Sequence, residues 1–232
     1  SPGMANFKDY VFKVIEKFDD LSGKEKQQYN YIPLVTFGAA KAAAIDIRLV
    51  DPNGRDEPGS KLNTMIGRAL DLYKKHDDNK ATQVIFADTI RSVKREKLND
   101  FLEDKATTQE LDEDPGTEDE ELEAGEFNLY EEIRNKLVAG GVPENEIASI
   151  QDYKTPESRE KLFEKVNSGD VRFVIGGTQK LGTGVNMQER MIAAHHLDVP
   201  WTPADLEQRD GRVYRQGNIF GELGVPVQLN RY

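Results

Sequence analysis

The sequence of 232 residues contains no cysteine and only one tryptophan. The lack of cysteine excludes disulfide bonds and thiolate metal sites, and it is typical of proteins kept in a reducing compartment. Long apolar runs are also missing: no stretch of about 18 apolar residues occurs, whereas a membrane-spanning helix needs about 20. We therefore expect a cytoplasmic protein with no membrane partner.

Two nucleotide-binding motifs are incomplete or absent. Residues 177–182 follow the first half of a Walker A loop, Gly-x-x-x-x-Gly, but Thr183 and Gly184 stand where Lys and Ser or Thr are required. Without that lysine, no charge is available for the β and γ phosphates. The dinucleotide fingerprint Gly-x-Gly-x-x-Gly is missing, which disfavours an independent nucleotide-binding enzyme such as a methyltransferase. We expect this chain alone to hydrolyse no ATP.

Negative charge is concentrated in one segment. The net charge is −11, and residues 103–126 hold twelve acidic residues and one lysine, so this segment accounts for all of it. The rest of the chain is neutral overall and can still present a local basic face to a nucleic acid. Because the segment has few apolar residues, we expect a disordered surface loop, with a docking site for a partner as the alternative.

Hydrophobic periodicity divides the chain into a helical lead-in over residues 1–80 and an α/β lobe over residues 81–232. In the lead-in, apolar residues at helical spacing predict helices over residues 7–21, 39–49 and 61–75. In the lobe, apolar runs predict strands over residues 82–86, 147–150, 171–175 and about 192–199, with helices between them. One of these helices is expected to begin after Thr155 and to end at Gly169. This alternation predicts a parallel sheet with helices on both faces.

The most informative stretch follows the strand predicted at residues 171–175. It begins with a loop from Gly176 to Asn186, whose glycines let the backbone approach a phosphate closely. The next strand leads to Pro200, and Thr202 is the expected N-cap of a helix. On that helix, spacings of four and three place on one face three side chains suited to a polyphosphate: Gln208, Arg212 and Arg215.

These residues resemble motifs V and VI in the second RecA-like lobe of superfamily 2 helicases and translocases, especially the Swi/Snf-type branch. Motif V is matched by Thr178, Gly182, Gly184 and Asn186. The Pro-Trp-Asn-Pro element is matched by residues 200–203, with Thr202 in place of Asn, and motif VI is matched by Gln208, Gly211, Arg212 and Arg215. Asp88 and Thr89, which follow the strand at residues 82–86, look like motif IV. The stretch is also similar to helicase-like proteins encoded beside adenine methyltransferases on phages and conjugative elements.

The resemblance implies the C-terminal motor lobe of an ATP-dependent DNA helicase or translocase, as one part of a longer protein. ATP with Mg²⁺ would be held mainly by an N-terminal RecA-like lobe. Arg212 and Arg215 would act on the γ-phosphate as arginine fingers, oriented by Gln208. Cofactor-binding positions would be Gly182, Gly184, Asn186 and Gly211, and nucleic-acid contacts would be Thr178, Thr89 and Asp88. DNA is preferred to RNA only because of the Pro-Trp element, so RNA stays open.

Plainer explanations stay open for several residues. Thr89 can cap a helix, Trp201 can pack in a core, and an isolated pair such as Arg212 and Arg215 can form surface ion pairs. As an alternative function, the chain could be a non-catalytic interaction module that keeps the fold, with the acidic segment as its partner site. His195 and His196 point to opposite faces of their strand, so we expect hydrogen bonding in the core and no metal site.

Overall fold

The computed structural model describes residues 2–51, 53–88, 95–104, 127–181, 186–198, 200, 202–213 and 216–232. For Pro2, Gln179, Arg212 and Val213 it describes the backbone alone. The chain forms two compact units: Ser1–Ser60 with Arg91–Asn128 make a helical unit, and Lys61–Ile90 with Leu129–Tyr232 make a sheet unit.

The helical unit contains α1 (Pro2–Asp19), α2 (Gly23–Gln28), α3 (Ile32–Ile45), the short 3-10 helix η1 (Ile47–Leu49) and α5 (Glu96–Leu102). Helices α1, α3 and α5 pack against one another. Their buried apolar side chains include Phe7, Val14, Ile32 and Phe101. Helix α2 begins at a capping box, in which Ser22 and Glu25 each accept a hydrogen bond from the other's backbone N–H.

Helix α3 differs from the helix expected over residues 39–49. It begins earlier, at Ile32, because Pro33 lies in the first turn, where its missing N–H costs no hydrogen bond. It ends earlier because Asp46 has an extended backbone and its carboxylate accepts a hydrogen bond from the Arg48 N–H at 3.0 Å. This cap starts η1 as a separate turn.

The two units also divide the chain differently from the expected boundary at residue 80. Helix α4 (Lys61–Lys75) belongs to the sheet unit, where the side-chain amide of Gln83 donates to the Ala69 carbonyl at 2.9 Å. Helix α5 belongs to the helical unit, where Phe101 meets the Tyr29 ring edge-on with centroids 5.0 Å apart. Apolar packing decides both assignments, because each helix buries its stripe against partners distant in sequence.

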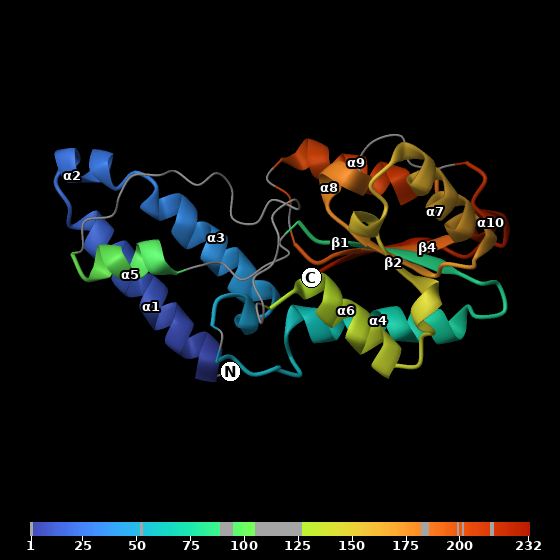
Figure 1. Cartoon of the computed structure of the whole chain (residues 1–232), viewed down its shortest axis with the longest axis horizontal. Helices are drawn as coiled ribbons and strands as arrows, with labels where there is room; N and C mark the ends of the chain where they lie inside the picture. The colour runs from blue at the N-terminus through green and yellow to red at the C-terminus, as the bar shows by residue number, and fades with distance from the viewer. Residues whose placement is uncertain are drawn as a thin grey trace. The chain divides into compact units, whose positions relative to one another are not determined.

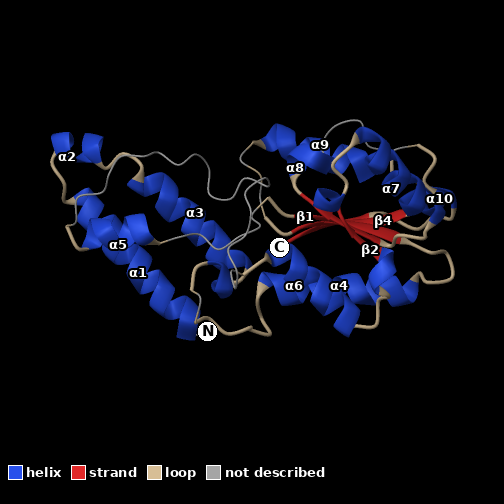
Figure 2. Cartoon of the chain, viewed as in Figure 1, coloured by secondary structure: helices blue, strands red, loops and turns tan. Residues whose placement is uncertain are grey.

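The sheet unit is built on five parallel strands in the order β2-β3-β1-β4-β5. The strands are β1 (Thr82–Phe86), β2 (Ile147–Ser149), β3 (Phe173–Gly176), β4 (Met191–His196) and β5 (Gln228–Arg231). Figure 2 shows them as one layer with helices above and below. Helices α4 and α6 (Leu129–Ala139) cover one face, and α7 (Pro156–Ser168), α8 (Thr178–Leu181) and α9 (Pro203–Val213) cover the other (Figure 1). The predicted α/β fold with a preceding helical segment is therefore confirmed. The short elements η2 (Glu144–Glu146), η3 (Ile150–Asp152) and α10 (Ile219–Glu222) lie between the others in sequence.

The centre of the sheet is buried on both faces. Every residue of β1, β3 and β4 is buried, as expected for parallel strands covered by helices. Val84 and Phe86 of β1 pack in one apolar cluster with Leu162 of α7 and Leu181 of α8. Strands β1, β3 and β4 end level with one another, so the polar residues that follow them lie at one edge of the sheet.

Capping residues and apolar patterns in the sequence predicted most helices and strands of the sheet unit. Thr155 caps α7 by accepting a hydrogen bond from the Ser158 N–H, and Gly169 ends that helix in a left-handed conformation at φ 80°. The strand bounds differ from those expected, because the strand expected at 171–175 is Phe173–Gly176 and the one expected at about 192–199 is Met191–His196. Val199 and the acidic residues 105–126 lie outside the described residues.

No described helix combines the length and the apolar character that crossing a membrane requires. Among the described residues, no group of three or more His, Cys, Asp or Glu side chains is arranged to hold a metal ion.

Candidate functional site

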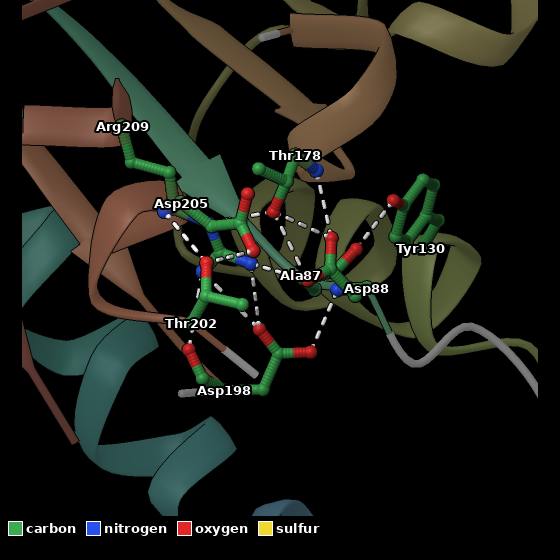
Figure 3. Close-up of polar contacts among 8 residues, drawn as sticks. All are labelled: Ala87, Asp88, Tyr130, Thr178, Asp198, Thr202, Asp205 and Arg209. Atoms are coloured by element: carbon green, nitrogen blue, oxygen red, sulfur yellow. Dashed lines mark hydrogen bonds and ion pairs between the residues drawn. The ribbon is translucent and has the colours of Figure 1, made fainter. Parts of the chain in front are cut away.

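The candidate site lies at the carboxyl edge of the three central strands. Phe86 of β1 is in register with Gly176 of β3 and with His196 of β4. Because the three strands end level, the residues that follow them converge, and Figure 3 shows Asp88, Thr178 and Asp198 grouped there. In open parallel sheets this edge is the usual place for ligands.

Arg209 binds helix α9 to this edge of the sheet, and its side chain is 0% exposed. Its guanidinium makes five hydrogen bonds. Nε donates to the Thr178 hydroxyl at 2.8 Å, and Nη1 donates to the carbonyl and the carboxylate of Asp198 at 3.1 and 3.3 Å. Nη2 donates to the carboxylates of Asp88 and of Asp198, the latter at 3.2 Å. Since arginine has five N–H donors, the whole fork is used within the lobe.

The acceptors of this fork are themselves linked to one another. The Asp198 carboxylate accepts the Asp88 backbone N–H at 2.7 Å. Asp88 Oδ1 accepts the backbone N–H of Thr178 at 2.7 Å and its hydroxyl at 2.9 Å. The Tyr130 hydroxyl of α6 donates to the Ala87 carbonyl at 2.7 Å, which holds the residue that follows β1 (Figure 3).

Arg209, Asp88, Thr178 and Asp198 form one group, called here the Arg209 cluster, and breaking it is costly because two of its three charged side chains are fully buried. Arg209 and Asp198 are fully buried at their side chains, and the Arg209 guanidinium also lies 5.2 Å from the centre of the Phe86 ring. Removing one partner of a buried ion pair leaves the other uncompensated, which costs about 3–5 kcal/mol. Helix α9 is therefore held in one orientation on the sheet.

Two further contacts fix α9 at its start and its middle. The Thr202 hydroxyl accepts the Asp205 N–H at 3.2 Å and donates to the Asp205 carboxylate at 2.7 Å, as expected for an N-cap. Asp210 accepts from Arg231 of β5 at 2.8 Å, and its other carboxylate oxygen lies 2.9 Å from Nε2 of His196 without hydrogen-bond alignment. The helix is thereby tied to β5 as well as to the strand ends.

Both histidines of β4 are buried, and the hydrogen bonding expected of them is found for His195. His195 contacts Gln83 at 2.8 Å and the Tyr232 hydroxyl at 2.9 Å through its two ring nitrogens. Burial, together with the charges of His196 and Arg68, lowers the pKa of His195 to about 3. Burial lowers the pKa of His196 to about 4, against the opposing effect of Asp210. Both rings are therefore neutral at pH 7.

The predicted catalytic and cofactor-binding residues fall into two groups. Gln208 and Gly211 on α9 are exposed, and so is Asn186, whose backbone carbonyl accepts from the Asn167 side chain at 2.8 Å. Gly182, Gly184 and Arg215 lie outside the described residues, and the side chain of Arg212 is not described. Their assigned roles stay predictions.

Gly211 has no packing reason to be glycine within the described part of the chain. A Cβ atom added there would have no heavy atom of the described residues within 4 Å, and the residue lies inside a helix. Glycine in a helix interior costs roughly 0.5–1 kcal/mol relative to alanine. The lobe tolerates this cost at an exposed position next to Arg212.

The predicted nucleic-acid residues are only partly described. Thr89 lies outside the described residues, while Asp88 and Thr178 belong to the Arg209 cluster. Sequence reasoning missed Arg209 and Asp198 as members of the site. Arg209 occupies one of the variable positions of motif VI, so the motif itself does not point to it. An arginine on the inner side of an amphipathic helix could still have indicated a buried ion pair.

Comparison with known families agrees with this geometry. Residues 142–217 match the family model of the helicase conserved C-terminal domain. The matched residues belong to the sheet unit, which is therefore similar to a helicase-type C-terminal lobe. The matched range contains Thr178, Asp198 and Arg209 of the buried cluster, whereas Asp88 precedes that range.

A relative of this lobe is the "Defense against restriction protein B" of Escherichia phage P1, which is 28% identical over 99 residues. The aligned region covers 43% of this chain and 4% of the phage protein. The chain thus spans a small fraction of the relative's length.

Proposed function

We propose that this chain is the second motor lobe of an ATP-dependent DNA translocase or helicase of the Swi/Snf-type branch. In this proposal ATP and Mg²⁺ are held mainly by the first lobe of the same protein. Arg212 and Arg215 of the helicase-type lobe reach the γ-phosphate, and Gln208 orients that contact. DNA is preferred to RNA on the Pro-Trp element at residues 200–203.

One observation carries the proposal: α9 is fixed to the sheet by Arg209, while two of its motif VI positions, Gln208 and Gly211, are exposed. No described residue needs Gly211 to be small. A rigid helix with an exposed amide and an exposed glycine is suited to contact a ligand that is held by the first lobe. Pre-organisation of this kind is what arginine fingers require, because they stabilise charge only when positioned in the transition state.

In the proposed reaction the bound nucleotide supplies the phosphoryl chemistry, and the lobe supplies position and charge. The two guanidiniums stabilise negative charge on the γ-phosphate oxygens as the bond to the β-phosphate breaks. Gly182, Gly184 and Asn186 belong to the loop between β3 and β4, which we assign to the nucleotide side of the cleft. The ends of β1 and β3, at Asp88 and Thr178, are assigned to the side that senses the nucleic-acid backbone. Closing and opening of the cleft would move the lobe along the strand.

The proposal is tested by ATP turnover in the protein that carries both lobes, at saturating DNA. We expect Arg212→Ala and Arg215→Ala each to lower turnover by about 10³- to 10⁵-fold, the usual contribution of an arginine finger. The matched control is Arg134→Ala, which removes an arginine on α6 whose ion pair with Asp152 is at the surface at 3.1 Å. The control should keep near-normal turnover.

Unchanged turnover in both Arg212→Ala and Arg215→Ala would end the motor-lobe proposal and would favour a non-catalytic interaction module with a helicase fold. DNA contact is tested separately by the salt dependence of binding, because each phosphate neutralised by a Lys or Arg side chain contributes about one to the slope of log K against log salt. Binding without salt dependence would remove the DNA-contact part of the proposal.

A further inference from the structure

The Arg209 cluster links the strand ends to the helix that carries motif VI. Its acceptors follow three different strands: Asp88 follows β1, Thr178 follows β3 and Asp198 follows β4. Arg209 is the neighbour of Gln208 on α9. A change in the position of any one strand end therefore changes the hydrogen bonds that set the orientation of α9.

Thr178 is committed to this cluster. Its hydroxyl has one proton, which it donates to Asp88 at 2.9 Å, while its oxygen accepts from Arg209 Nε at 2.8 Å. Its backbone N–H also donates to Asp88. Thr178 can donate to a phosphate only by giving up the bond to Asp88.

Asp88 is the member of the cluster that can be reached from outside. Its side chain is 35% exposed, whereas those of Arg209 and Asp198 are 0% exposed. A carboxylate cannot donate to a phosphate and repels it, so Asp88 is poorly suited to hold a nucleic-acid backbone directly. A phosphate near Asp88, or a cation paired with that phosphate, would instead change the electrostatic potential at the Asp88 carboxylate. It would thereby change the hydrogen bond between Asp88 and Arg209.

We propose that Arg209 is a positioning residue that couples the strand ends at Asp88 and Thr178 to the motif VI face of α9. This inference rests on the proposed function, and it assigns Thr178 and Asp88 an indirect role through Arg209. The planar fork of the guanidinium is essential, because five donors reach acceptors from three strand ends at once. A lysine at position 209 keeps the charge and loses this geometry.

The decisive experiment compares Thr178→Val with Thr178→Ser in the protein that carries both lobes. Valine keeps the shape of threonine and removes the hydroxyl that accepts from Arg209, whereas serine keeps it. We expect Thr178→Val to lower kcat at saturating ATP and DNA on the order of 10²-fold, since a misplacement of about 1 Å costs that much. Thr178→Ser should restore most of kcat, and neither variant should change KM for ATP.

Two further readouts separate positioning from direct contact and from simple structural support. If Thr178 instead holds a phosphate, Thr178→Val will weaken DNA binding with the salt slope unchanged, because a neutral hydroxyl releases no counterion, and that result would overturn the inference. A merely structural role predicts a lower Tm with normal kcat for the folded protein, and that result would overturn it too. Arg209→Lys should lower kcat as Thr178→Val does, with the salt slope unchanged; normal kcat in Arg209→Lys would contradict the need for the fork.

Failure of the coupling can be distinguished from failure of the proposed function. Unchanged turnover in Arg212→Ala and Arg215→Ala would remove the proposed function, and the coupling with it. Loss of turnover in those two variants together with normal kcat in Thr178→Val would remove the coupling alone.

Discussion

Gly211 offers a test in which stability and activity should move in opposite directions. The change is Gly211→Ala, at a position inside α9 that faces solvent and where an added Cβ would have no heavy atom of the described residues within 4 Å. Alanine fits the helical backbone there without strain. It also limits the unfolded chain more than glycine does, so it should favour the folded state.

The size of the gain follows from the helix preference. Replacing glycine by alanine in a helix interior is worth roughly 0.5–1 kcal/mol. Gly211 lies two residues before the end of α9 at Val213, so the lower half of that range is expected. For a protein of this size, about 0.5 kcal/mol corresponds to a rise in Tm of about 1–2 °C. If the motif VI face closes on a nucleotide, the added methyl group should at the same time lower ATP turnover.

Gly67→Ala is the matched control. Gly67 lies inside α4, is exposed, and an added Cβ there would likewise meet no heavy atom within 4 Å in the described ranges. Thermal melts should show a gain in Tm for both variants, larger in Gly67→Ala because Gly67 lies in the middle of its helix, and turnover should fall only in Gly211→Ala. A Tm for Gly211→Ala below that of the unsubstituted protein, or turnover equal to that of Gly67→Ala, would refute the reasoning that position 211 is kept small for an approaching ligand.

Two other predictions concern the stability of the chain. Gly169→Ala should destabilise the protein by about 2–4 kcal/mol, because φ is +80° and the new Cβ would lie 2.6 Å from the Lys80 Cβ. Gly141→Ala is the control, since φ is +98° and no described residue lies close, and it should cost only about 1 kcal/mol. Equal losses of unfolding free energy in denaturant would disprove the steric contribution at Gly169. The pKa values of His195 and His196 are lowered to about 3 and about 4, so the unfolded chain binds protons below pH 6.5 that the folded chain does not. The free energy of unfolding should therefore be at its full value above pH 6.5 and should be lower at pH 5 by about 2 kcal/mol for each ring. A flat profile between pH 7 and pH 5 would contradict burial of both neutral rings.

Local patterns in the sequence predicted the elements whose ends are chemically marked. Helix α4 has the bounds expected from its apolar stripe, and β1 has the bounds expected from its apolar run. Thr155 and Gly169 mark the ends of α7 through a side-chain cap and a left-handed backbone. These signals depend on residues within one turn of the element, so no tertiary information was needed.

Helix α3 and the division into units were harder to predict, because they depend on choices between local signals and on distant packing. Pro33 is compatible both with a linker and with the first turn of a helix, and the structure has the second. Helix α5 follows β1 in sequence but buries Phe101 in the helical unit.

The buried cluster could not be predicted from spacing along the chain. Arg209 pairs with Asp198, 11 residues away, and with Asp88, 121 residues away. An isolated arginine on a helix is expected at the surface. Only the parallel register, which brings the ends of β1, β3 and β4 together, places both carboxylates around the guanidinium.

A split between ATP binding and ATP hydrolysis tests most directly whether the motif VI arginines, Arg212 and Arg215, act on ATP bound by another lobe. In the two-lobed protein with saturating DNA, single-turnover hydrolysis and ATP affinity should be measured for Arg212→Ala and Arg215→Ala. We predict that the hydrolysis rate falls by about 10³-fold or more while the Kd for ATP stays close to that of the unsubstituted protein, because an arginine finger acts in the transition state. Normal hydrolysis in both variants, or a loss confined to ATP affinity, would contradict the account.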